Sequence, residues 1–167
     1  MLKIKSYKMK QILIALDNND GAQKIAETGY ELSAALHAHT TLMHVTSDST
    51  YYSYLNYSPI LGYDSFSNLD VVQTDTVKEL NRTAQHYLDN VKLNLGDKTI
   101  RTIVKEGDYA ENILQTAKEI RADIIVMGTH SRKGLDKVLL GSVAEKVLHH
   151  ANIPLFIIPV NLAEKEK

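Results

Sequence analysis

Residues 99–127 read TIRTIVKEGDYAENILQTAKEIRADIIVM and contain one complete strand–helix–strand unit. The first stretch, 99–104, alternates apolar and polar residues, which predicts a strand. Asp108 followed by Glu111 is a capping box, and the apolar residues after it recur at helical spacing. Residues 123–127 form a nearly continuous apolar run, typical of a strand covered on both faces. Two strands joined by a helix predict a right-handed crossover within a parallel sheet.

The rest of the chain repeats this alternation of strand and helix. Apolar runs predict further strands at 11–16, 40–45 and 155–158. Helical spacing of apolar residues predicts helices over 22–36 and 77–95. Ser142 with Glu145 repeats the capping-box signal and predicts a last helix. Five strands and four helices predict an α/β fold, an open parallel sheet with helices on both faces, whose ligands bind at the carboxyl ends of the strands.

Composition places the chain among single-domain soluble proteins and excludes several functions. The 167 residues are 44% hydrophobic and 23% charged, and the net charge is -1. We therefore expect no nucleic-acid partner and no membrane partner, because the chain has neither a global basic field nor an apolar run of about 20 residues. Cysteine is absent, which excludes disulfides and thiolate chemistry. We expect a cytoplasmic location.

Three segments stand apart from the expected domain, which spans residues 9–160. Residues 1–8 are basic and are interpreted as an N-terminal extension, and residues 161–167 as a charged tail. Residues 46–70 are rich in tyrosine and break the strand–helix rhythm. They contain no Lys or Arg, which argues against binding of single-stranded nucleic acid. Two interpretations stay open, an insertion packed on the domain or a partner subunit, and a lid over a ligand.

Residues 127–147, MGTHSRKGLDKVLLGSVAEKV, run from a strand end through a glycine-containing loop to a helix start. A helix N-terminus presents unpaired N–H groups and partial positive charge, so this arrangement can bind an anion. The backbone of residues 142–144 could hold a phosphate, and the Ser142 hydroxyl could donate to it. Arg132 and Lys133 could add positive charge. Ser142 is already explained as an ordinary helix cap, and the two roles are compatible because a capping hydroxyl can turn toward a ligand.

Other phosphate-binding and catalytic patterns are absent from the sequence. There is no Gly-x4-Gly-Lys-Ser/Thr loop, and the loop DNNDG after the first strand lacks the dinucleotide-binding glycines. The histidines show no metal-ligand spacing, and His130 is interpreted as a solvated loop residue. No pairing of a nucleophile with a base is identifiable. We therefore predict no catalytic residue and no metal site.

The 127–147 stretch resembles the ATP-binding branch of the universal stress protein family. That branch carries Gly, two residues, Gly, nine residues, then Gly and Ser or Thr. Here Gly128, Gly141 and Ser142 match in identity and spacing, while Ser131 stands where the family has its second glycine. The resemblance extends over residues 9–160 and includes the segments ILIALD, TTLMHV and EKVLHHANIPLFIIP.

The resemblance implies a fold like that of the adenine nucleotide alpha hydrolases, with strand order 3-2-1-4-5. It implies a regulatory module in a stress response that binds ATP, which Mg²⁺ can accompany. It also implies a homodimer formed through Leu155 to Ile158. The nucleotide-binding residues that it implies are Ala15, Asp17, Thr41, Met127, Gly128, Ser131, Arg132, Gly141, Ser142 and Val143. Two alternatives stay open, a dimeric interaction module that needs no nucleotide and a weak ATPase.

Overall fold

Five parallel strands form one sheet in the order β3-β2-β1-β4-β5, so the predicted fold class and strand order are confirmed. The computed structural model describes residues 9–19, 21–46, 66–131 and 140–161. The strands are β1 (Gln11–Ala15), β2 (His39–Thr46), β3 (Arg101–Glu106), β4 (Ile124–Ser131) and β5 (Leu155–Asn161). Residues 1–8, the tail from 162 and most of the tyrosine-rich segment lie outside the described residues.

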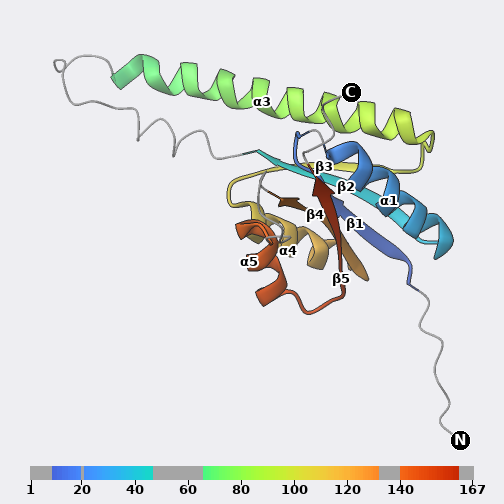
Figure 1. Cartoon of the computed structure of the whole chain (residues 1–167). Helices are drawn as coiled ribbons and strands as arrows, with labels where there is room; N and C mark the ends of the chain where they lie inside the picture. The colour runs from blue at the N-terminus through green and yellow to red at the C-terminus, as the bar shows by residue number, and fades with distance from the viewer. Residues whose placement is uncertain (1–8, 20, 47–65, 132–139, 162–167) are drawn as a thin grey trace, which may run out of the picture.

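Helices cover both faces of the sheet (Figure 1). They are α1 (Ala22–Ala35), α3 (Phe66–Leu95), α4 (Tyr109–Glu119) and α5 (Ser142–His150). Because successive strand residues point to opposite faces, Ile12 and Ile14 of β1 belong to the core cluster beneath α1 and α3. Leu13 between them belongs to the second cluster, beneath α4 and α5.

The chain leaves the neighbouring strands β1 and β4 toward opposite faces of the sheet. From β1 the chain crosses to β2 through α1 on one face, and from β4 it crosses to β5 through α5 on the other face. The two outgoing connections therefore separate at the carboxyl ends of β1 and β4. That separation is the topological switch point, where open α/β sheets leave a crevice for a ligand.

Helix α3 is longer than the sequence predicted. It begins at Phe66, whereas the apolar spacing marked a helix only from Val77. The apolar pattern identifies the part of a helix that packs on a core, but no Gly or Pro interrupts residues 66–95, so nothing in the backbone ends the helix earlier. Residues 66–70, which were predicted to belong to the tyrosine-rich insertion, are therefore helical.

Two further predictions around the candidate site were wrong. The fourth strand was predicted to end at Met127, but β4 continues to Ser131 because β5 pairs with it along that length, Gly128 opposite Ile158. Gly128 therefore lies within a strand and not in a loop. The capping box at the last helix does not form either, since the N-cap of α5 is Gly141, with no side-chain hydrogen bond, and Ser142 is the first helical residue.

Candidate functional site

A hollow of about 680 Å³ opens at the carboxyl edge of the sheet, at the switch point between β1 and β4. Its volume lies in the range of ligand-binding pockets, about 300–1,000 Å³. It is lined by Ala15, Leu16, Asp17, Ile25, Met43, His44, Val45, Tyr109, Ile113, Met127, Gly128, Leu140, Gly141, Ser142, Val143 and Ala144.

The structure brings most of the predicted site residues together around this hollow. Those that line it are Ala15, Asp17, Met127, Gly128, Gly141, Ser142 and Val143. Ser131 ends β4 opposite Asn161, and its side chain is not described. Arg132 lies outside the described residues. Strands and a helix that are distant in the sequence thus converge on one edge, as a parallel sheet requires.

Thr41 does not line the hollow. It is fully buried at the middle of the sheet, where it pairs with Leu13, and its Oγ1 accepts a hydrogen bond of 2.8 Å from Gln11 Nε2. The residue of β2 level with the end of β1 is Met43, which pairs with Ala15. The register between β1 and β2 decides this. A strand pattern alone does not contain the register, so sequence reasoning missed Met43 and the adjacent Val45.

The loop after β1 is held in place by its own Asn19 and by side chains from α3 and β2. Asn19 donates from Nδ2 to Asp17 Oδ2 at 2.6 Å, and Asn19 Oδ1 accepts from the Gly21 N–H at 2.9 Å. The Tyr87 hydroxyl of α3 donates to the backbone oxygen of Asp17 at 2.8 Å. His44 Nδ1 lies 2.8 Å from the Leu16 carbonyl, which assigns its proton to Nδ1. These contacts orient the Asp17 carboxylate at the rim of the hollow.

Burial beside a carboxylate affects the Tyr87 side chain. Burial first, and then the negative charge of Asp17, raise the pKa of Tyr87 to about 12. The Tyr87 ring also meets the His44 ring edge-on, with centroids 5.6 Å apart. Tyr87 is therefore a neutral hydrogen-bond donor at physiological pH, and it ties α3 to the loop that carries Asp17.

The N-terminus of α5 forms one wall of the hollow. Gly141, its N-cap, has φ -64° and ψ 156°, an extended conformation open to any residue. Its carbonyl accepts the first helical hydrogen bond from the Glu145 N–H at 2.9 Å. The N–H groups at the first positions of a helix have no partner within the helix, so this wall presents donors and the positive end of the helix dipole.

The two motif glycines differ in what surrounds them. A Cβ added at Gly128 would overlap Ile25 Cδ1, so the close packing of β4 against α1 disfavours a larger residue there unless the Ile25 side chain moves. A Cβ added at Gly141 would meet nothing within 4 Å among the described residues. Within the described part of the chain, neither conformation nor packing excludes a side chain at position 141, where glycine serves as the N-cap.

A buried hydroxyl lies on β4 just beyond Met127. Thr129 is only 2% exposed, and its Oγ1 has no hydrogen-bond partner among residues that the structure describes. By the alternation of a strand, Thr129 faces the same side as Met127, which lines the hollow. An unpaired buried hydroxyl is costly, but Thr129 itself does not line the hollow.

A second hollow, of about 760 Å³, lies between α4 and α5. None of the predicted site residues lines it. Within the described ranges, no group of three or more His, Asp or Glu side chains is arranged to hold a metal ion. Across the same ranges, no helix combines the length and apolar character that crossing a membrane requires.

Comparisons with known proteins agree on one family. Residues 8–159 match the model of the Universal stress protein family. The chain is 28% identical over 149 residues to Universal stress protein MJ0531 of Methanocaldococcus jannaschii, covering 89% of this chain and 81% of the relative. The fold is similar to that of universal stress protein UspA from Lactobacillus plantarum, with a TM-score of 0.69, 20% identity, and coverage of 91% and 99% of the two chains. It is also similar to a universal stress protein crystallised in complex with cAMP, with a TM-score of 0.57, 17% identity, and coverage of 92% and 98%.

Proposed function

The chain belongs to the universal stress protein family, and on that premise we propose that it binds an adenine nucleotide, ATP, in the hollow at the carboxyl edge of its sheet. The protein would act as a regulatory module whose nucleotide occupancy changes its partners in a stress response. We place this activity in the cytoplasm, and expect Mg²⁺ to enter with the triphosphate.

The observation that carries the proposal is the environment of Gly141. This residue lines the hollow at the positive end of a helix, and neither its backbone conformation nor its neighbours in the described protein exclude a side chain, although glycine is a better N-cap than alanine. A glycine at such a position allows a phosphate to approach the helix N–H groups closely, which a Cβ would obstruct. The family motif places a glycine at this position too, and the same motif continues with Ser142.

The remaining residues suit the other parts of a nucleotide. Asp17, whose carboxylate is oriented by Asn19, would accept hydrogen bonds from the ribose hydroxyls. The apolar side chains of Met43, Val45 and Ile113 line the hollow and offer a dry surface for a base. A universal stress protein with this fold was crystallised with cAMP, which contains the same adenosine and phosphate parts.

We also propose that the protein is a homodimer formed through β5. This strand is at the edge of the sheet, and Phe156 on it is 40% exposed. An exposed apolar edge favours pairing with another chain, so a second copy is the simplest cover. We expect sedimentation to give a dimer for the wild type and a monomer for Phe156→Lys. A wild type that stays monomeric at micromolar concentration would contradict the dimer.

Native mass spectrometry of freshly purified protein, followed by thermal unfolding with added nucleotide, tests the nucleotide proposal. If ATP binds with a Kd of about 10 μM, then about 1 mM ATP adds about 2.7 kcal/mol of stability and raises Tm by about 5–10 °C. AMP should raise Tm less, because it lacks the outer phosphates that the α5 N-terminus would hold. A nucleotide-free dimer whose Tm no adenine nucleotide changes would favour the alternative, an interaction module that needs no nucleotide.

A further inference from the structure

Tyr109 is the first residue of α4, and sequence reasoning did not place it at the site. It lines the hollow and remains 42% exposed, whereas Ile113, one turn further along α4, also lines the hollow but is buried. A single exposed aromatic residue is ordinary on a protein surface. Here, however, the exposed ring belongs to the wall of a cavity of ligand size.

Four buried residues that line the same hollow as Tyr109 give it an apolar region. Ile113 of α4, Met43 and Val45 of β2, and Met127 of β4 line the hollow and are each no more than 5% exposed. Methionine sulfur makes favourable contacts with aromatic rings. The wall formed by the start of α5 is polar instead, because backbone N–H groups are available there. The hollow therefore combines an apolar region with an anion-binding region.

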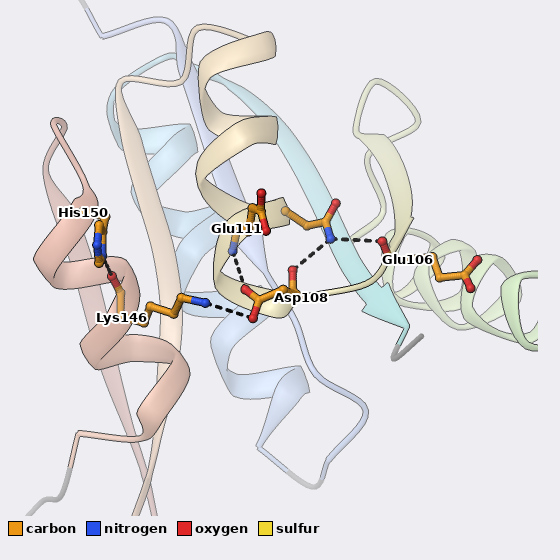
Figure 2. A network of polar contacts seen from close by, with 6 residues as sticks. Glu106, Asp108, Glu111, Lys146 and His150 are labelled. Carbon is orange, nitrogen blue, oxygen red and sulfur yellow. Dashed lines mark hydrogen bonds and ion pairs between the residues drawn. The ribbon is translucent and has the colours of Figure 1, made fainter. Parts of the chain in front are cut away.

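The backbone that carries Tyr109 is fixed by the network shown in Figure 2. The carboxylate of Asp108 accepts from the Glu111 N–H at 2.8 Å through Oδ1, and from Lys146 Nζ of α5 at 3.0 Å through Oδ2. Asn112 Nδ2 donates to the backbone oxygens of Glu106, at 3.1 Å, and Asp108, at 2.8 Å. The start of α4 is thus tied to α5, whose first residues form the anion-binding wall.

A rigid aromatic ring beside an apolar cavity is a platform for stacking, because every nucleobase presents a flat π-face. We propose that the Tyr109 ring stacks on the base of the bound nucleotide and so makes the site selective for ligands with an aromatic base. This inference rests on the proposed nucleotide binding, and it adds the residue that recognises the base. The Asp108–Lys146 link ties the start of α4, which carries the ring, to the helix whose N-terminus lines the hollow.

The test compares ATP binding by calorimetry in the wild type and in Tyr109→Phe, Tyr109→Leu and Tyr109→Ala. Because Tyr109 is exposed and at a helix start, we expect all four proteins to fold. Phe keeps the ring and should bind within about twofold of the wild type. Tyr109→Leu and Tyr109→Ala remove the ring and should weaken ATP binding by about tenfold, equivalent to about 1.4 kcal/mol. The leucine variant keeps an apolar side chain without a ring, so it distinguishes stacking from the effect of apolar volume.

A fluorescence measurement gives a second, independent readout. The chain contains no tryptophan, so Tyr109→Trp introduces the only one. Stacking of adenine on this ring should quench its emission with the same saturation as the calorimetric binding curve. Leu93→Trp is the control, since Leu93 is 72% exposed on α3 and does not line the hollow. Its emission should not respond to ATP.

The outcomes separate the two proposals. If the wild type binds ATP and the Leu and Ala variants bind it equally well, the stacking role is wrong while nucleotide binding stands. If Leu binds like the wild type and only Ala weakens, apolar bulk and not the ring is responsible, and stacking is again wrong. If the wild type does not bind ATP, the proposed function fails and this inference fails with it.

Discussion

Gly141→Ala distinguishes an effect on the stability of the protein from an effect on nucleotide binding. At this position φ is -64° and an added Cβ meets nothing within 4 Å among the described residues. The new methyl group would instead occupy the space in front of the helix N–H groups, where the phosphates are proposed to lie. The substitution should therefore leave the fold nearly unchanged and weaken nucleotide binding.

The two effects differ in size. Alanine is a poorer N-cap than glycine, and we expect a loss of about 0.5–1 kcal/mol, or about 1–4 °C in Tm, without ligand. A tenfold weaker Kd, about 100 μM, reduces the stabilisation by about 1 mM ATP from about 2.7 to about 1.4 kcal/mol. The rise in Tm caused by ATP should fall from about 5–10 °C to about 3–6 °C.

The assay is thermal unfolding with and without ATP, in protein shown by mass spectrometry to be free of nucleotide. Gly141→Val extends the series, because its branched side chain should abolish the rise in Tm. Gly96→Ala is the matched control. Gly96 has φ +72° and open space around it, so alanine there costs about 1–2 kcal/mol of backbone strain, but it does not line the hollow. That variant should lose stability and keep the full response to ATP.

The refuting result is equally definite. If Gly141→Ala and Gly141→Val keep the full rise in Tm that the wild type shows with ATP, then no phosphate passes position 141. The argument from the open environment of this glycine would then be wrong. A large loss of stability without ligand would contradict the reasoning differently, because it would mean that the protein itself requires glycine there.

Substitutions at Gly128, Tyr87 and Asp108 test the packing and hydrogen bonds around the site. Gly128→Ala should lower the free energy of unfolding by about 1–3 kcal/mol in a denaturant titration, because its Cβ would overlap Ile25 Cδ1. Adding Ile25→Val removes that carbon and should recover part of the loss; no recovery would contradict the packing explanation. Tyr87→Phe removes the hydrogen bond to the backbone of Asp17 and should cost about 1 kcal/mol at neutral pH. The pKa of Tyr87 is raised from 10.0 to about 12, so its hydroxyl stabilises the fold below pH 10 and this contribution is lost as pH rises towards 12. The cost of Tyr87→Phe should therefore shrink over that range. A cost that stays constant would argue against this role of the hydroxyl. Asp108→Ala should cost about 1 kcal/mol through the lost cap, and Asp108→Asn much less. The hydrogen bond from the Glu111 N–H, and then Lys146 of α5, hold the pKa of Asp108 below 3.8. The cost of Asp108→Ala should therefore be full above pH 3.8 and fall below it. Equal costs for Asp108→Ala and Asp108→Asn would rule out the capping role.

Local patterns predicted several features that depend on neighbours in the chain. The cap at Asp108 forms as predicted, because the residues that make it are three positions apart. The runs 11–16 and 123–127 become the central strands β1 and β4, since an apolar run needs cover on both faces wherever it is placed. The same local reasoning failed at Ser142, where the cap pattern is present and the hydrogen bond is not.

The alternation of strands and helices, the parallel sheet and the edge at which the hollow lies could be predicted from the sequence, because periodicity and crossover handedness are properties of consecutive residues. Which residues meet at that edge depends on how the elements pack. Met43, and not Thr41, reaches the hollow because of strand register, and Tyr109 joins it because α4 packs beside α5. Gly128 serves the packing of Ile25, whereas Gly141 stands open. These distinctions depend on distances between residues far apart in the chain, which no local pattern contains.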